Sequence, residues 1–533
     1  MDYYIDKKDQ KISTFIVRLA GLSYFSAVIW NFQWVVSHLN LNSIFSIIVS
    51  CLFLFATMLI TVSGIVLVIN NWNFSLLEPK KLISRKKPEV AVIIPTYSEP
   101  IELIINTVKS VANQNWPKSK RVIIISDDGY SDILREAVKK FKLQRGERRI
   151  FYHRPHKKGH PERRGEAKAG NLNSTLDWVV KKFPNIEFIE TRDADDIVGT
   201  DDFLSYCMEV LKNDQELSFV QTIKQSEVDK HDPFSNQEAI FYQRVMPSRN
   251  ASNATFPCGS GLIWRLSELR RIGGFPAWNL VEDLQSGFEI LSLGGKGAFL
   301  PIVGAIGQIA PEDIPNFYKQ RGTWALDTLR LFYFRNPIFA KGLAPMQKMH
   351  FFELEFSYLL SYAMFIFILI ISLGLTFKVY PVLSSPLEYF IHFIIFAVIL
   401  ELYNIARSRG ISYSQLWRTR QIWLGLMPVF MLASIMALAH GPYKKPAYKV
   451  TRKYHEFAWY WKETLPQKLI VGVLAISIVV SVLSGKGDAY MDSVLIFWAL
   501  FFIYGLSQVI KNSWHGMSFK KAATKQEVEF DLV

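Results

Sequence analysis

The segment Ile189-Glu190-Thr191-Arg192-Asp193-Ala194-Asp195-Asp196 places a pair of acids, Asp193 and Asp195, directly after an apolar run. In a β-strand the side chains at positions i and i+2 point to the same face, so these two carboxylates are expected to converge where the strand ends. Hard oxygen ligands of this kind suit Mg²⁺ or Mn²⁺, and Mg²⁺ commonly binds one or two carboxylates together with phosphate oxygens. A solvated acidic turn is the alternative for an isolated acid pair, so the neighbouring motifs must decide.

Composition and charge indicate a membrane protein. Half of the 533 residues are hydrophobic, and the formal net charge is +14. Much of the positive charge flanks apolar runs, which is typical of cytoplasmic loops beside an anionic lipid leaflet. We therefore expect membrane lipid, and not nucleic acid, as the partner of this charge. The flanking basic residues are Lys7, Lys8, Lys11, Arg18, Lys80, Lys81, Arg85, Lys86, Lys87, Arg407, Arg409, Arg418, Arg420, Lys444, Lys445, Lys449, Arg452 and Lys453.

Cysteine and histidine do not indicate a structural metal. The three cysteines have no paired spacing of the kind found in disulfide frameworks or zinc sites. His153, His156 and His160 resemble a metal-binding tract, but lysine and arginine lie between them and disfavour a cation.

Six apolar runs predict membrane-spanning helices. They lie at residues 19–39, 44–69, 356–377, 387–406, 469–483 and 493–510. The first run is too long and too rich in tryptophan for a signal peptide, and it lacks a small-residue cleavage site. The short uncharged link at residues 40–43 makes the first two runs a hairpin with both ends in the cytoplasm.

The apolar run at residues 422–438 is predicted to lie at the membrane interface. It contains Pro428 and has basic residues on both sides. Counting it as a span would place the basic loop at residues 444–453 outside the cell, against the positive-inside tendency.

Residues 88–315 have the pattern of a soluble α/β domain. A β-branched run at residues 89–95 leads into Thr96, and a helical segment follows at residues 101–113. A second strand at residues 121–126 leads into Asp127-Asp128-Gly129, and a third at residues 186–189 leads into the acid pair. Polar residues at the carboxyl ends of successive strands mark the ligand crevice of an open parallel sheet.

Seven soluble motifs, taken in order, resemble the processive family-2 glycosyltransferases, and specifically the catalytic subunits of cellulose synthases. The motifs are Pro95-Thr96-Tyr97-Ser98-Glu99-Pro100, Asp127-Asp128-Gly129, Lys168-Ala169-Gly170-Asn171-Leu172-Asn173, Asp193-Ala194-Asp195, Phe256-Pro257-Cys258-Gly259-Ser260-Gly261, Glu282-Asp283 and Gln320-Arg321-Gly322-Thr323-Trp324. The resemblance extends over residues 19–510. It implies a multi-pass α-helical membrane protein with an inserted cytoplasmic α/β domain of the GT-A (nucleotide-diphospho-sugar transferase) type.

The resemblance also implies a division of the chain. The expected parts are an N-terminal segment and transmembrane hairpin (1–87), the GT-A domain (88–315), interfacial helices (316–350), transmembrane helices (351–410), an interfacial helix and gating loop (411–465), transmembrane helices (466–511) and a cytoplasmic tail (512–533).

Donor-side roles follow from the matched positions. The resemblance implies that the uridine is held by Thr96, Tyr97, Glu99, Asp127 and Asp128. A carboxylate there can accept a hydrogen bond from a base N–H, although a DDG sequence is also an ordinary β-turn. The remaining residues expected to line the substrate site are Lys168, Gln221, Cys258, Gly259 and Glu282. The metal ligands would be Asp193 and Asp195, with Asp196 where the family often has histidine.

Asp283 is the expected catalytic base. Transfer that inverts the anomeric carbon requires a carboxylate that takes the proton of the acceptor hydroxyl as its oxygen attacks C1. The alternative is that Glu282-Asp283 only favours the start of a helix at residues 284–293 through the helix dipole.

The acceptor side is expected at Gln320, Arg321 and Trp324, where Trp324 would stack on the sugar at the growing end. A tryptophan anchored at the membrane interface is the alternative. Thr323 replaces the second arginine of the family's Q-x-x-R-W pattern. This replacement puts a diphosphate contact and strict processivity in question, and we expect Arg321, Lys168 or Lys453 to compensate for the missing arginine.

Tyr448-Lys449-Val450-Thr451-Arg452-Lys453 resembles the F-x-V-T-x-K gating loop of cellulose synthases. The resemblance implies that Thr451 and Lys453 close over the donor. A basic juxtamembrane loop that contacts lipid headgroups is the alternative.

Together these motifs predict a synthase in the cell membrane that extends a polysaccharide from a UDP-sugar, with UDP-glucose as the expected donor and Mg²⁺ or Mn²⁺ as cofactor. The growing polysaccharide, a cellulose-like or capsular β-glucan, would leave through the protein's own helices. The alternatives are a non-processive transferase that adds one sugar to a lipid or glycan, and an export pore with a degenerate transferase domain. Linkage, primer, self-association and export or regulatory partners stay open.

Overall fold

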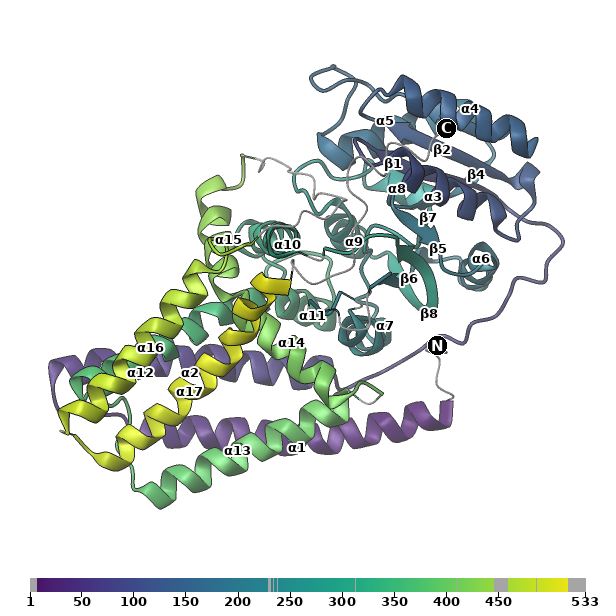
Figure 1. Ribbon diagram of the computed structural model, residues 1–533. Coiled ribbons are helices and arrows are strands. Elements are labelled where there is room, and N and C mark those ends of the chain that lie inside the picture. Colours follow the sequence, from purple (N-terminus) through teal and green to yellow (C-terminus); the bar gives the residue numbers. More distant parts are fainter. Residues whose placement is uncertain are drawn as a thin grey trace.

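The computed structural model describes residues 7–228, 232, 234–236, 238–311, 313–408, 410–444, 459–485 and 487–515. The expected gating-loop residues Thr451 and Lys453 lie outside this part of the chain, as does the tail beyond residue 515. In Figure 1 the sheet domain lies at one end of the molecule and the long apolar helices lie at the other.

The soluble domain is built on one sheet with the strand order β3-β2-β1-β4-β7-β6-β8-β5. The strands are β1 (Glu89–Thr96), β2 (Arg121–Asp127), β3 (Ile150–His153), β4 (Ile186–Thr191), β5 (Asp196–Val198), β6 (Leu217–Ser226), β7 (Leu262–Arg265) and β8 (Lys296–Gly307). Strands β3, β2, β1 and β4 are parallel, whereas β7 is antiparallel to both of its neighbours and β5 is antiparallel to β8. The three predicted strands are confirmed, and the sheet is mixed instead of wholly parallel.

Alternating side chains of β1 fill the cores on both faces of the sheet. Val92 and Ile94 pack with Ile104 and Val108 of α3, whereas the opposite face of the strand packs against α5. Because successive side chains of a strand point to opposite faces, a strand covered by helices on both sides reads as a continuous apolar run. The soluble-domain helices are α3 (Ile101–Asn113), α4 (Asp132–Arg145), α5 (Ala167–Lys182), α6 (Phe203–Asn213), α7 (Met246–Ala251), α8 (Leu266–Arg271) and α9 (Glu282–Ser292).

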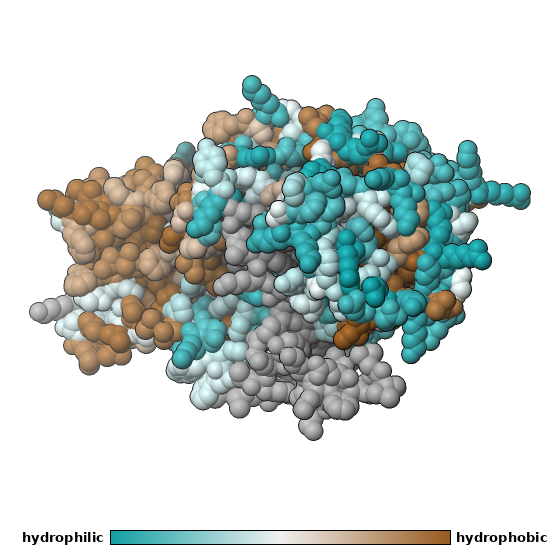
Figure 2. Space-filling model, turned by 90° about the horizontal axis from the view of Figure 1, so that it is seen from above, coloured by the Kyte–Doolittle hydropathy of each residue, from teal (hydrophilic) through white to brown (hydrophobic). Residues whose placement is uncertain are grey.

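Six helices within the described residues are long and apolar enough to cross a membrane. They coincide with the six predicted runs: α1 (Lys7–Ser37), α2 (Ile44–Asn70), α12 (Leu360–Phe377), α13 (Pro386–Arg407), α16 (Leu465–Ser484) and α17 (Ala489–His515). Figure 2 shows hydrophobic side chains gathered over this end of the molecule and hydrophilic ones over the sheet domain. The helix α11 (Pro345–Phe356) leads into α12 and extends that candidate span to Pro345–Phe377.

The run predicted to be interfacial is a broken helix. It forms α14 (Tyr413–Gly425) and α15 (Met427–His440), which meet at an angle of 50°. Pro428 stands in the first turn of α15, where its missing N–H costs no helical hydrogen bond. Leu426 and Phe430 at this bend pack against α10 (Ile314–Phe334), the helix that joins the soluble domain to the membrane helices.

Candidate active site

One large cavity, of about 2540 Å³, joins the carboxyl ends of the central strands to the membrane helices. Of the predicted site residues that the structure describes, all except Asp127 and Gln221 line it. The lining members of that set are Thr96, Tyr97, Glu99, Asp128, Lys168, Asp193, Asp195, Cys258, Gly259, Glu282, Asp283, Gln320, Arg321 and Trp324. Residues separated by more than two hundred positions in the sequence therefore share one surface.

The acid pair lies just beyond β4 and not within it. Strand β4 ends at Thr191, and Asp193 and Asp195 occupy the turn that leads into β5. The backbone N–H of Asp193 donates to Ser260 Oγ at 3.2 Å, and the carbonyl oxygen of Asp195 accepts from the N–H of Gln308 at 2.8 Å. Hydrogen bonds at both positions hold this turn so that the two carboxylates reach the same cavity. The alternation of side chains along a strand, on which the prediction was based, is not the reason that they converge.

Two lysines bind the carboxylate of Asp193. Lys168 Nζ, from the first turn of α5, lies 2.7 Å from Oδ1, and Lys224 Nζ, from β6, lies 2.7 Å from Oδ2. Lys224 also lies 2.8 Å from Oδ2 of the buried Asp196. Burial alone would raise the pKa of Asp193, but the two ammonium groups outweigh it and hold that pKa well below its usual range.

Asp283 stands in the first turn of α9, beside these charges. Its Oδ1 accepts the N–H of Leu284 at 2.8 Å, and Lys168 Nζ lies 3.5 Å from the neighbouring Glu282. Burial, and then the negative charge of Glu282, raise the pKa of Asp283 to about 7, against the opposing effect of Lys168. A carboxylate with a pKa near neutrality is suited to general-base chemistry.

Gly259 allows this acid and lysine to meet. It adopts φ +82, and a Cβ at its position would lie 2.9 Å from Asp283 Oδ2 and 3.2 Å from Lys168 Nζ. A side chain would therefore collide with Asp283 and strain the backbone. The neighbouring Cys258 also lines the cavity, and burial raises the pKa of its thiol.

Gln221 holds the Cys258 motif from behind the cavity wall. Its Oε1 accepts the N–H of Cys258 at 2.7 Å, and its Nε2 donates to the carbonyl of Ser260 at 3.1 Å. The structure gives Gln221 a place behind the wall, as a support for the motif that borders Asp283.

The two acids of the DDG motif have different surroundings. Asp127 accepts hydrogen bonds from the N–H groups of Gly129 and Ser131, at 2.8 and 2.7 Å, and from the hydroxyls of Thr96 and Tyr152, at 3.3 and 2.7 Å. These four bonds engage both oxygens, so Asp127 stabilises the turn after β2. It does not face the cavity.

Asp128 faces the cavity and is held by an arginine that the sequence did not single out as a partner. Arg163 donates from Nη1 and Nη2 to the two oxygens of Asp128, each at 2.6 Å. Such a bidentate pair fixes the orientation of the carboxylate. Glu99 Oε2 accepts the N–H of Tyr97 at 2.8 Å, which shapes the adjoining loop.

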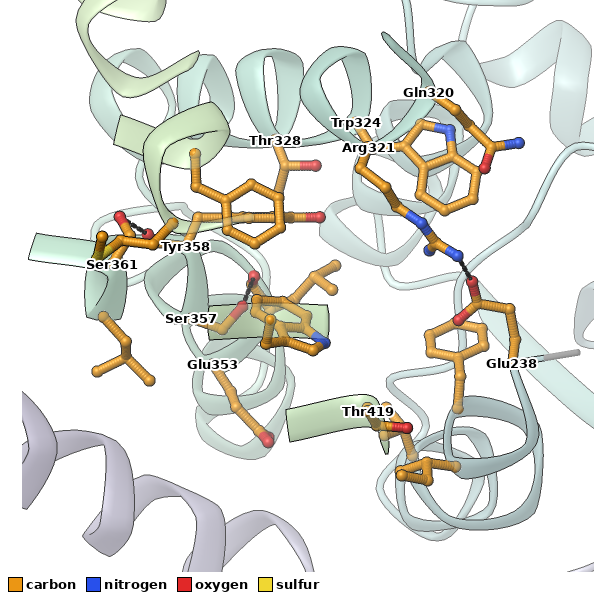
Figure 3. A pocket seen from close by; sticks show the side chains of 18 of the residues that line it. Glu238, Gln320, Arg321, Trp324, Thr328, Glu353, Ser357, Tyr358, Ser361 and Thr419 are labelled. Atoms are coloured by element: carbon orange, nitrogen blue, oxygen red, sulfur yellow. Dashed lines mark hydrogen bonds and ion pairs between the residues drawn. The ribbon is translucent and has the colours of Figure 1, made fainter. Parts of the chain in front are cut away.

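The helix α10 carries the expected acceptor residues. The guanidinium of Arg321 forms an ion pair with Glu238 and lies 4.7 Å from the centre of the Trp324 ring (Figure 3). Trp324 remains partly exposed toward the cavity. Arg321 is one of three residues expected to replace the missing diphosphate contact, and in this geometry its charge is directed toward Glu238 and its face is stacked on the indole.

Beyond Trp324 the cavity runs between the membrane helices. Figure 3 shows Thr328, Glu353, Ser357, Tyr358 and Ser361 along its wall. Farther on, the lining side chains come from α1, α2, α12, α13 and α17 and include Tyr24, Trp34, Phe53, Phe367, Tyr389 and Trp498. The wall changes from charged to aromatic and aliphatic as it enters the apolar end of the protein.

Two family models match the chain. The model described as Glycosyl transferase family 2 matches residues 91–272, and the model described as Glycosyl transferase family group 2 matches residues 188–506. The second match covers more than half of the chain and includes the membrane helices α12, α13 and α16.

Curated relatives match the soluble part. A cellulose synthase catalytic subunit (UDP-forming) from Pseudomonas fluorescens is 31% identical over 264 residues, which is 48% of this chain and 33% of that protein. A second, from Xanthomonas axonopodis, is 28% identical over 270 residues, or 49% of this chain and 34% of that protein. The matched region spans about a third of the length of these relatives.

Among solved structures, the mannosyltransferase PcManGT from Pyrobaculum calidifontis, in complex with GDP-Man and Mn²⁺, superimposes with a TM-score of 0.52 at 18% identity. The match covers 73% of this chain and 99% of the mannosyltransferase. The two proteins therefore share a fold.

Proposed function

This chain belongs to glycosyl transferase family group 2, and we propose that it is a processive, inverting transferase that polymerises UDP-glucose into a β-glucan and passes the product across the cell membrane. The observation that carries the proposal is a single cavity. It holds Asp193 and Asp283, with Lys168 paired to Asp193 and to Glu282, the neighbour of Asp283, and it continues past Trp324 between the membrane helices.

The proposed reaction is a single displacement at the anomeric carbon. Asp283 accepts the proton of the acceptor hydroxyl while the oxygen forms a bond to C1 of the donor sugar. The bond between C1 and the diphosphate oxygen breaks, and UDP leaves with the electron pair. The pKa of about 7 at Asp283 keeps a large fraction of this side chain ionised near neutral pH and still basic enough to take the proton.

The carboxylates on the cavity wall fit a hard divalent cation. Asp193 and Asp195 face the same space, and oxygen donors of this kind suit Mg²⁺ or Mn²⁺. When bound, such an ion would neutralise negative charge on the departing diphosphate. Lys168 is placed to support the same charge from the other side, since it already lies between Asp193 and Glu282.

The nucleoside would lie against the loops after β1 and β2. Thr96, Tyr97, Glu99 and Asp128 border this part of the cavity, and Arg163 fixes Asp128. The base of uridine has an N–H group that can donate a hydrogen bond to a carboxylate. We keep Asp128 and Glu99 as the proposed base contacts and assign Asp127 to the turn.

The acceptor would lie on Trp324, since the faces of sugar rings pack on aromatic side chains through their C–H surfaces. Aromatic residues along the rest of the cavity, among them Trp34 and Tyr389, would let a polysaccharide slide without strong polar anchoring. Basic loops beside the apolar helices support a cytoplasmic catalytic domain in this proposal. Closure of Thr451 and Lys453 over the donor remains a prediction from the sequence.

The test uses purified full-length protein in lipid nanodiscs with a panel of radiolabelled UDP-sugars. We expect UDP release and polymer from UDP-glucose in the presence of Mg²⁺ or Mn²⁺, and we expect a β-glucan-specific glycosidase to degrade the polymer. Transfer of one sugar only, to a lipid or glycan, would replace the proposal with the non-processive alternative. Absence of transfer from every donor would favour the export pore.

A further inference from the structure

Lys224 lies at the centre of the acidic cluster. Its ammonium is 2.7 Å from Asp193 and 2.8 Å from Asp196, and it lines the same cavity. It projects from β6, an element remote in sequence from the turn that carries the acids. Two carboxylates at this distance favour the charged ammonium form of the side chain.

The two lysines together occupy both oxygens of Asp193. Lys168 contacts Oδ1 and Lys224 contacts Oδ2, each at 2.7 Å. A divalent ion binds carboxylate oxygen at about 2.0–2.1 Å for Mg²⁺. Such an ion and an ammonium group at the same oxygen would repel one another strongly in a partly buried site. One lysine must therefore move before Asp193 can act as a metal ligand.

Each lysine has a second carboxylate beside it, but that of Lys224 is closer, with Asp196 at 2.8 Å against 3.5 Å from Lys168 to Glu282. The buried Asp196 also accepts its charge, so Lys224 can release Asp193 and stay in the cavity. A diphosphate entering beside Asp193 would offer it further negative oxygens. Lys168 is held by ion pairs with Asp193 and Glu282, and the negative charge of Asp283 attracts it further.

We infer that Lys224 is a resident cation that competes with the divalent ion for Asp193, so that the site takes up its metal together with a nucleoside diphosphate and not before it. This inference rests on the proposed function, because it takes Asp193 as a metal ligand and a nucleoside diphosphate as part of the donor. It also gives Asp196 a role: its carboxylate retains Lys224 when Asp193 is released.

The simpler interpretation is that Lys224 only neutralises buried carboxylates. The two interpretations differ in the effect of removing the charge. If Lys224 only neutralises, its loss leaves metal affinity unchanged or lowers it by disordering Asp193. If Lys224 competes, its loss raises metal affinity in the absence of nucleotide.

The experiment measures Mn²⁺ binding to the purified full-length protein by electron paramagnetic resonance, with and without UDP. In the wild type we expect weak binding alone and binding at least about tenfold tighter with UDP. In Lys224→Met we expect binding without UDP to be at least about tenfold tighter than in the wild type, with little further gain from UDP. Equal or weaker Mn²⁺ binding in Lys224→Met without UDP would overturn the inference.

Matched variants keep the result interpretable. Lys181→Met removes one positive charge from the exposed far end of α5, outside the cavity, and should bind Mn²⁺ as the wild type does. If Lys224→Met does not fold, the double variant Lys224→Met/Asp196→Asn removes the buried charge as well. It should still bind Mn²⁺ more tightly than Asp196→Asn alone, and equal affinity in those two would count against competition.

The readout separates this inference from the proposed donor. Tighter Mn²⁺ binding in Lys224→Met without nucleotide supports competition whatever sugar is transferred. If GDP tightens Mn²⁺ binding to the wild type and UDP does not, the proposed donor is wrong but the competition between Lys224 and the ion is still supported. Absence of Mn²⁺ binding in every variant, alongside normal transfer from UDP-glucose, overturns the inference and leaves the transfer reaction in place.

Discussion

Turnover should rise about tenfold between pH 6 and pH 8, because Asp283 must be ionised to act as a general base. Its pKa is raised to about 7, first by burial and then by the charge of Glu282, whereas Lys168 acts in the opposite direction. Since the active form is the carboxylate, activity is present above this pKa and is lost as the pH falls through about 7.

The size of the effect follows from the ionised fraction. With a pKa of about 7, Asp283 is ionised in about a tenth of molecules at pH 6 and in about nine tenths at pH 8. An aspartate with the ordinary pKa of about 3.9 would be almost fully ionised at both values, and the profile would be flat. The expected slope on the acidic limb is about tenfold per pH unit.

The assay is the initial rate of UDP release at subsaturating donor, from pH 5.5 to 8.5, with the same profile recorded for two neighbouring variants. Glu282→Gln removes a negative neighbour and should move the midpoint to lower pH. Lys168→Met removes a positive one and should move it to higher pH, whatever it does to the maximal rate. A flat wild-type profile between pH 6 and pH 8, or midpoints that move the other way, would refute the assignment of Asp283.

Five further substitutions distinguish chemistry, acceptor binding and folding. Asp283→Asn should lower turnover by about 10²–10⁴-fold with unchanged UDP affinity measured by calorimetry, and near-normal turnover would remove Asp283 from the mechanism. Trp324→Ala should shorten the product while UDP release continues. Arg321→Ala and Glu238→Gln should also shorten it, because the ion pair between Arg321 and Glu238 supports the indole. Product of normal length in all three variants would make Trp324 an interface anchor. Asp127→Ala should lower the melting temperature, because it leaves hydrogen-bond donors of the turn after β2 without a partner, at a cost of about 1–3 kcal/mol. An unchanged melting temperature together with lost UDP binding would show that Asp127 contacts the donor.

Hydrophobic patterning predicted the six long apolar helices and the strands β1, β2 and β4, but not the other strands of the sheet. All six apolar runs are helices of spanning length, and the helix Ile101–Asn113 has the predicted bounds. These predictions depend on neighbouring residues along the chain, where burial imposes a period on the sequence. Pro428 and the basic flanks led to the prediction that residues 422–438 lie at the membrane interface, whereas the break between α14 and α15 was not predicted.

The side-chain contacts that define the site could not be predicted from the sequence. Lys224 meets Asp193 and Asp196, Arg163 meets Asp128, and Gln221 meets Cys258, each pair joining different elements. Such pairings depend on how the sheet and its loops fold together, and no local period records them. A lysine near the carboxyl end of a buried strand was the available signal for Lys224.

The motif around Trp324 shows the limit of reasoning from matched positions. The replacement at Thr323 led to the prediction that Arg321, Lys168 or Lys453 supplies the diphosphate contact, and in the structure Arg321 is held by Glu238 and stacked on Trp324. Arg321 and Thr323 are two residues apart on α10, so their side chains point about 200° away from each other around the helix and one does not replace the other. The additional cation that the structure provides near the acid pair is Lys224 of β6.

Product length at low conversion tests the central claim most directly. Purified wild-type protein in nanodiscs is given radiolabelled UDP-glucose, the reaction is chased with excess unlabelled donor, and labelled products are sized while most enzyme molecules have started a single chain. A processive synthase gives long labelled chains that lengthen during the chase and are degraded by a β-glucan-specific glycosidase. Short products that stop at one or two added sugars, with no change during the chase, would contradict the account.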